Sequence, residues 1–260
     1  MAVLNNLKPA GIWSHFEEMC AIPHPSKHEA AMREYVVNFA KKNNLEYEVD
    51  EVGNVVIRKP ATKGMEDRKG VILQGHLDMV PQANSDANHN FEKDPIKPRV
   101  DGEWVKATGT TLGADNGIGV SSALAVLESK DLVHGPIEAL FTIDEETGMT
   151  GAFGLKLGYL KGDILMNLDS EDEGELFIGC AGGTNASAVF KYKKTAVPAK
   201  HAAYKVTVKG LKGGHSGCDI HLGRGNSNKL LFRFLRYAER NIGLVLAAVE
   251  GGNLRNAIPR

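Results

Sequence analysis

The chain has 260 residues, of which 42% are hydrophobic and 24% charged, a composition typical of a folded globular protein. Its formal net charge of -1 gives no indication of a nucleic-acid or acidic-membrane partner, and it has no apolar run of the roughly 18 residues that could cross a bilayer. No basic region followed by an apolar stretch suggests a secretory signal, and the three widely spaced cysteines form no disulfide framework. We therefore expect reduced thiols and a cytoplasmic location.

Helix and strand patterns alternate over the first two thirds of the chain. Apolar residues at helical spacing predict a helix over 9–21, and Ser26 to Glu29 has the spacing of a capping box that opens a second helix. Another helix is expected over 118–127. Short apolar runs predict strands over 55–57, 71–73, 137–143 and 164–168. Strands that alternate with helices in this way indicate an α/β domain with a largely parallel sheet, which we assign to residues 1–185.

The pattern changes in the last third. Apolar residues alternate with polar ones over 188–192 and 204–208, which predicts antiparallel strands with one solvated face. A helix is expected over 227–240 and a further strand over 242–249. We assign residues 186–260 to a second, smaller α+β domain. Because the sequence stops while this domain would still be adding strands, we expect it to be incomplete.

Four polar clusters come directly after predicted strands or open a predicted helix. Because ligands bind beyond the carboxyl ends of the strands in an open α/β sheet, the four clusters are expected to converge at one edge. Their members are His76 and Asp78 after the strand at 71–73, Asp115 before the helix at 118–127, Glu145 and Glu146 after the strand at 137–143, and Asp169 after the strand at 164–168.

The residue types in these clusters suit a divalent metal. One imidazole and several carboxylates are the ligands that zinc or manganese takes in hydrolytic sites, and a carboxylate can bridge two ions about 3.5–4 Å apart. Asp78 is placed to accept the second N–H of His76 and fix its orientation. Of the adjacent acids Glu145 and Glu146, one can bind metal while the other takes a proton from water.

Taken singly, each cluster has an ordinary structural explanation. A His-x-Asp pair fits any surface loop, Asp115-Asn116-Gly117 fits a turn, and Asp144-Glu145-Glu146 fits an exposed acidic helix cap. All of them together in one α/β domain favour a metal site. His215, in a glycine-rich loop, is open to two interpretations, a flexible hairpin or a donor to a developing oxyanion. No motif for nucleotide binding is present.

These motifs resemble those of the M20 family of metallopeptidases. The segments that carry the resemblance are 75–78 (GHLD), 113–117 (GADNG), 144–148 (DEETG), 167–169 (NLD) and 213–217 (GGHSG). Within the family, the segments 101–104 and 110–119 are similar to those of the bacterial aminoacyl-histidine dipeptidases, the peptidase D group. The resemblance extends over essentially the whole chain.

The resemblance implies a zinc-peptidase catalytic domain over 1–185 and an inserted lid or dimerisation domain over 186–260. It implies two zinc ions, with manganese or cobalt as substitutes. In the family pattern His76 and Asp169 hold one ion, Asp115 bridges and Glu146 holds the other. Asp78 then orients His76, Glu145 is the general base, and His215 and Asn256 contact the substrate or its oxyanion.

The implied substrates are unblocked dipeptides of broad composition, including Xaa-His dipeptides such as carnosine, and a homodimer through the lid domain is implied as well. The family pattern also includes a final His ligand to the Glu146 zinc after the lid, and this sequence has none. We therefore expect an N-terminal portion of a longer enzyme, with an incomplete second metal site and little activity on its own. The alternatives are an M20-type deacylase or carboxypeptidase, or an inactive metal-binding or dimerisation module.

Overall fold

The computed structural model describes residues 3–84, 86–170, 172–180, 182, 184, 186–252 and 255–260. The chain divides into two compact units, residues 1–182 and 183–260, which are described separately below. Among the described residues, no helix combines the length and the apolar character needed to cross a membrane. The sequence predicted a domain boundary at residue 185, three residues after this division. The boundary stays a prediction.

The first unit is built on a five-stranded sheet with the strand order β1-β2-β6-β3-β7. β3 pairs with β6 and β7 in parallel, whereas β2 is antiparallel to both of its neighbours, so β2 is the one strand of this sheet that runs in the opposite direction. The predicted α/β fold with a largely parallel sheet is therefore confirmed. The strands are β1 (Glu46–Val49), β2 (Val55–Lys59), β3 (Val71–His76), β6 (Ile137–Thr142) and β7 (Ile164–Asn167).

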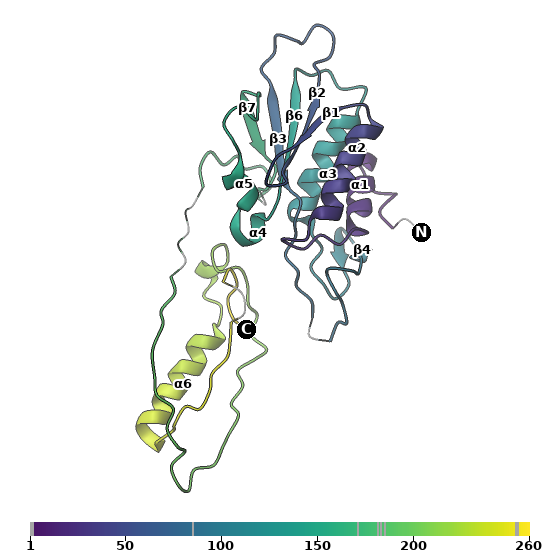
Figure 1. Ribbon diagram of the computed structural model, residues 1–260. Coiled ribbons are helices and arrows are strands. Elements are labelled where there is room, and N and C mark those ends of the chain that lie inside the picture. Colours follow the sequence, from purple (N-terminus) through teal and green to yellow (C-terminus); the bar gives the residue numbers. More distant parts are fainter. Residues whose placement is uncertain are drawn as a thin grey trace. The chain divides into compact units, whose positions relative to one another are not determined.

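Three helices cover one face of this sheet: α1 (Ala10–Cys20), α2 (Ala30–Lys42) and α3 (Ala114–Glu128) (Figure 1). The main core lies between these helices and the sheet, and it contains the fully buried side chains of Phe141, Leu77 and Val120. A smaller cluster around Leu140 packs on the other face of the sheet. Burial on both faces explains why β3 and β6 could be predicted from short apolar runs.

A second, two-stranded sheet joins β4 (Pro98–Asp101) to β5 (Trp104–Ala107) as an antiparallel hairpin. Gly102 lies in its turn with φ +63°, a backbone angle that glycine adopts without steric cost. Two short helices, α4 (Glu145–Gly148) and α5 (Thr150–Gly154), follow β6.

The predicted capping box before the second helix is wrong. α2 begins at Ala30, after Glu29, and no side chain caps its first turn. The Ser26 hydroxyl donates instead to the Asp78 carboxylate, 2.7 Å away, and Glu29 accepts the backbone N–H groups of Lys27 and Asp144. Long-range hydrogen bonds with buried groups have therefore displaced the local cap.

The second unit contains the helix α6 (Ser227–Ile242) and the short 3₁₀ helix η1 (Ile220–Leu222). The helix predicted over 227–240 is present, and the Asn226 side chain caps its first turn. The structure has no strands over 188–192, 204–208 and 242–249, where the sequence predicted them. Among the described residues, these segments pair with no other strand. An isolated bridge between His215 and Ala257 is the β-type pairing described in this unit.

Candidate metal centre

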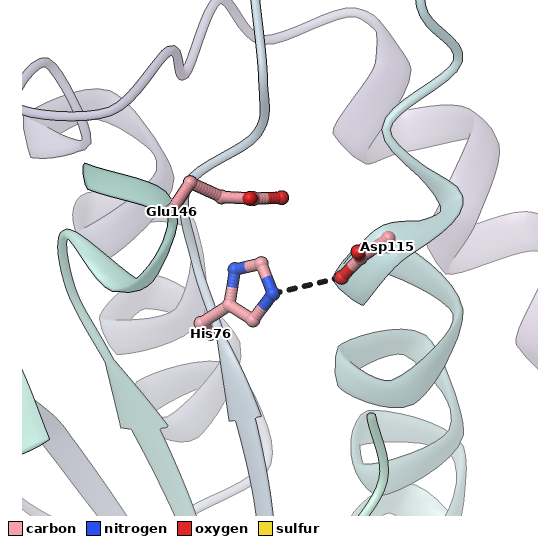
Figure 2. Close-up of side chains that lie close together, drawn as sticks. All are labelled: His76, Asp115 and Glu146. Carbon is pink, nitrogen blue, oxygen red and sulfur yellow. Dashed lines mark hydrogen bonds and ion pairs between the residues drawn. The ribbon is translucent and has the colours of Figure 1, made fainter. Parts of the chain in front are cut away.

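Three side chains from three different elements meet at the carboxyl end of the sheet. His76 is the last residue of β3, Asp115 lies at the start of α3, and Glu146 belongs to α4 (Figure 2). One ligand atom from each of the three lies within 4.8 Å of the other two. The structure thus brings together clusters that are separated by up to 70 residues in the sequence.

The shortest contact in this group joins His76 to Asp115. The His76 Nε2 atom lies 2.9 Å from Asp115 Oδ1 and 3.6 Å from Asp169 Oδ1. His76 is almost completely buried, whereas the two aspartates are partly exposed. An imidazole nitrogen surrounded by carboxylate oxygens at these spacings provides the N and O donors that a divalent transition metal prefers.

Asp78 lies behind His76 and connects several parts of the site. His76 Nδ1 is 3.2 Å from Asp78 Oδ1 and 3.0 Å from the Asp78 carbonyl oxygen. The same carboxylate accepts the Ser26 hydroxyl and the backbone N–H groups of Glu145 and Glu146, at 2.7, 3.0 and 3.2 Å. The fully buried Asp78 therefore holds both the imidazole and the segment that carries the two glutamates.

The charges of the site are crowded. Burial lowers the pKa of His76, but hydrogen bonds that the ring donates to the carboxylates of Asp115, Asp169 and Asp78 outweigh it and raise this pKa to about 12. Burial, together with the charge of Asp115, raises the pKa of Glu146 to about 7. Burial also raises the pKa of Glu145 and of Asp169. Carboxylates pressed together in this way are stabilised by a bound cation, so this site fits a divalent metal.

Asn116 holds Asp169 in place. Its side-chain Nδ2 donates to Asp169 Oδ1 and to the Leu168 carbonyl oxygen, at 2.8 Å each. Its Oδ1 is buried without a hydrogen-bond partner and lies against Gly75 and Gly119, where an added Cβ atom would collide with it. Glycine at both positions therefore leaves room for the amide to reach Asp169.

A second group of acids lies deeper in the first unit. Glu29, Asp78 and Asp144 are all buried, with one oxygen from each within 4.8 Å of the other two. Backbone N–H groups or hydroxyls donate to each of these carboxylates, including the Thr147 and Thr150 hydroxyls to Asp144. Their hydrogen bonds indicate a structural role that connects the segment before α2 to the segment after β6.

The remaining two candidate residues lie together in the second unit. Ser216 donates its backbone N–H to the Asn256 carbonyl oxygen at 2.9 Å, next to the bridge between His215 and Ala257. His215 is exposed. The glycine-rich loop and the segment 255–258 thus form one local structure, although 40 residues separate them in the sequence.

The sequence patterns missed Ser26 and Asn116 as parts of the site. Ser26 has the spacing of a helix cap, and Asn116 stands in a sequence that also fits a turn. The part of the signal for Asn116 that lies nearby in the sequence is Gly119, whereas Gly75, the other glycine that makes room for the amide, is brought beside it by the fold. No local signal points to the bond between Ser26 and Asp78, since 52 residues separate them.

Comparisons with known proteins agree on one family. Peptidase family M20/M25/M40 matches residues 72–215, and a peptidase dimerisation domain matches residues 206–260. The cytosol non-specific dipeptidase of Escherichia coli strain K12 is 57% identical to this chain over 260 residues, which are 100% of this chain and 54% of that protein.

Solved structures show a similar relation. The aminoacylhistidine dipeptidase of Vibrio alginolyticus superimposes with a TM-score of 0.68 at 54% identity, over 99% of this chain and 52% of that one. The aminopeptidase PepT of Bacillus cereus shares the fold with a TM-score of 0.53 at 19% identity, over 96% of this chain and 63% of that one. The chain therefore spans about half the length of the two dipeptidases that it matches.

Proposed function

Since this chain belongs to peptidase family M20/M25/M40, we propose that it carries the metal site of an enzyme that hydrolyses unblocked dipeptides. The observation that carries the proposal is the convergence of His76, Asp115 and Glu146 within 4.8 Å, next to a second glutamate with a raised pKa. Broad specificity that includes Xaa-His dipeptides is supported by the names of the two similar dipeptidases. A cytoplasmic location is proposed on the same grounds.

Two zinc ions are the proposed cofactor. In this proposal His76 and Asp169 would hold one ion, Glu146 would hold the other, and Asp115 would be a ligand shared by both. When bound, such ions polarise the peptide carbonyl and make water a nucleophile at neutral pH. The contact between His76 and Asp115, and that between Asp169 and His76, support this assignment.

Glu145 is the proposed general base. Its backbone N–H is held by the buried Asp78, and burial raises its pKa, which suits a group that must gain and lose a proton. In the proposed reaction a Glu145 oxygen takes a proton from the attacking water and passes it to the nitrogen of the leaving amine. Asp78 keeps the His76 ring in the orientation in which Nε2 faces the carboxylates.

The second unit is proposed to contact the substrate and to mediate dimerisation. The match to a peptidase dimerisation domain over 206–260 supports the homodimer. His215 is proposed to donate a hydrogen bond to the substrate carbonyl as it gains negative charge, and Asn256 to bind the substrate. Their proximity within one local structure supports a shared role.

Neighbouring glutamates provide a matched test of these roles. With β-alanyl-histidine as substrate and added zinc, Glu145→Gln should lower kcat by about 10²- to 10⁴-fold, the range for loss of a general base, without changing bound zinc. Glu146→Gln should lower the zinc content as well. Turnover that survives Glu145→Gln contradicts the role of Glu145.

The substrate class is tested with a blocked analogue. Free β-alanyl-histidine should be cleaved faster than its N-acetylated form. Faster cleavage of the blocked compound would contradict the dipeptidase proposal and favour a deacylase. A chelator should abolish hydrolysis of the free dipeptide, and hydrolysis that a chelator leaves unchanged would contradict metal dependence.

A further inference from the structure

The ring of His215 is held by its own loop. Its Nδ1 accepts the backbone N–H groups of Gly217 and Cys218, at 3.0 and 3.1 Å. Its backbone N–H donates to Asp219 Oδ2 at 2.8 Å, and its carbonyl oxygen accepts the Asp219 N–H at 3.1 Å. Although the residue is exposed, one of its two ring nitrogens is therefore already in use.

An ion pair between Asp219 and Arg224 supports this loop. The Arg224 guanidinium lies 2.9 Å from Asp219 Oδ2 and donates to the Gly213 carbonyl oxygen at 2.9 Å. Gly214 has φ +144° and leaves room for this guanidinium, which an added Cβ atom would strike. On the other side, Ile258 donates its N–H to the Gly214 carbonyl oxygen at 2.7 Å.

This geometry determines which nitrogen of the neutral ring carries the proton. A neutral imidazole has one N–H donor and one acceptor nitrogen. Two N–H groups aimed at Nδ1 require a lone pair there, so the proton must reside on Nε2. We propose that the loop fixes neutral His215 as the Nε2–H tautomer, and that Asp219 and Arg224 are the positioning residues that maintain it.

The consequence for catalysis rests on the proposed function. A fixed Nε2–H is a permanent donor for a carbonyl oxygen that gains negative charge, and preorganised donors of this kind lower the reaction barrier. The other tautomer would present a lone pair to that oxygen and repel it. Gly217 leaves room for this arrangement, because an added Cβ atom there would lie 3.2 Å from His215 Nδ1.

The direct test is the tautomer itself. Nitrogen-15 NMR of the histidine-labelled full chain, with the ring in its neutral form, distinguishes protonated from unprotonated ring nitrogens. Loss of a signal in His215→Gln assigns the resonance. We expect His215 to be almost entirely the Nε2–H form. A tautomer mixture like that of free histidine, or a majority of the Nδ1–H form, would overturn the proposal.

Two variants test the positioning residues. Asp219→Ala and Arg224→Gln should each shift the His215 tautomer toward that mixture and lower kcat by about 10- to 100-fold, with KM changed less. Arg236→Gln, at an exposed arginine of the same unit that pairs with Glu239, is the matched control and should change neither quantity. An unchanged tautomer in both loop variants would overturn the roles of Asp219 and Arg224.

The two proposals fail separately. A chain that binds no zinc but shows the Nε2–H form of His215 contradicts the proposed function and supports the tautomer assignment. A chain that binds zinc but shows a mixed tautomer of His215 supports the proposed function and overturns the tautomer assignment.

Discussion

The two units contain similar apolar patterns but use them differently. In the first unit, the run at 137–142 becomes β6, every residue of which is buried between β2 and β3. In the second unit, the alternating run at 204–208 pairs with no described strand and is largely exposed. An apolar pattern therefore favours a strand, but the strand forms only where a neighbouring strand is available to hydrogen-bond with it.

The polar sites of the two units also differ in how much they depend on contacts between residues far apart in the sequence. The candidate metal centre depends on residues that β3, β6 and α3 bring together over long sequence distances. The His215 loop is held mainly by bonds among residues 213–224, with a second contact from 256–258. Long-range order supports the first site, whereas short-range hydrogen bonds support most of the second.

The largest expected difference between the units is in stability. Phe141→Ala empties a fully buried position of the first unit and should cost about 3–5 kcal/mol. Phe190→Ala, at a side chain that is 83% exposed in the second unit, should stay within about 0.5 kcal/mol. Urea unfolding of the two variants measures both effects. If both variants lost the same free energy of unfolding, the contrast between the buried core of the first unit and the exposed apolar side chains of the second would be contradicted.

Removal of one proposed ligand should weaken metal binding, whereas removal of His215 should not. Asp115→Ala should weaken zinc binding by more than the roughly 10- to 100-fold that outer hydrogen-bond partners contribute. His215→Ala, in the other unit, should leave zinc affinity unchanged. Calorimetric titration of the two variants compares them directly, and a zinc affinity that falls equally in both would contradict the assignment of the metal to the first unit.

A smaller effect on zinc affinity is expected from loss of the Ser26 hydroxyl, which lies behind His76. Ser26→Ala removes the donor to Asp78 and should weaken zinc binding by about tenfold, because Asp78 orients His76. Ser26→Thr keeps the hydroxyl and serves as the control, with affinity close to that of the unchanged chain. If alanine and threonine behave alike, Ser26 has no positioning role.

At neutral pH the smallest effect is the one that concerns the cysteines. Burial raises the pKa of Cys20 to about 12, whereas Cys218 is exposed. Because the unfolded thiol ionises near pH 9.0, the stability contributed by neutral Cys20 is complete below that pH and is lost as the pH rises toward about 12. Cys20→Ala should flatten this part of the pH–stability curve. A thiol reagent should label Cys218 in the folded chain before Cys20, and the reverse order would contradict the burial of Cys20.

The sequence predicted the first unit well because its signals are strong and local. β3, β6 and β7 are short apolar runs followed by polar residues, so both the strands and the edge where His76, Glu146 and Asp169 lie could be inferred. Three features were not predicted. The bond between Ser26 and Asp78 competes with a local helix cap, Asn116 reaches Asp169 only because the fold brings two glycines beside it, and strand pairing in the second unit cannot be read from alternation alone.

The central claim is that the first unit binds a divalent metal through the cluster of His76, Asp115 and Glu146. The measurement that tests it most directly is a calorimetric zinc titration of the purified chain beside Asp115→Ala. The account predicts saturable zinc binding by the unchanged chain and its loss in the variant. Absence of binding, or equal binding by the two proteins, would contradict it.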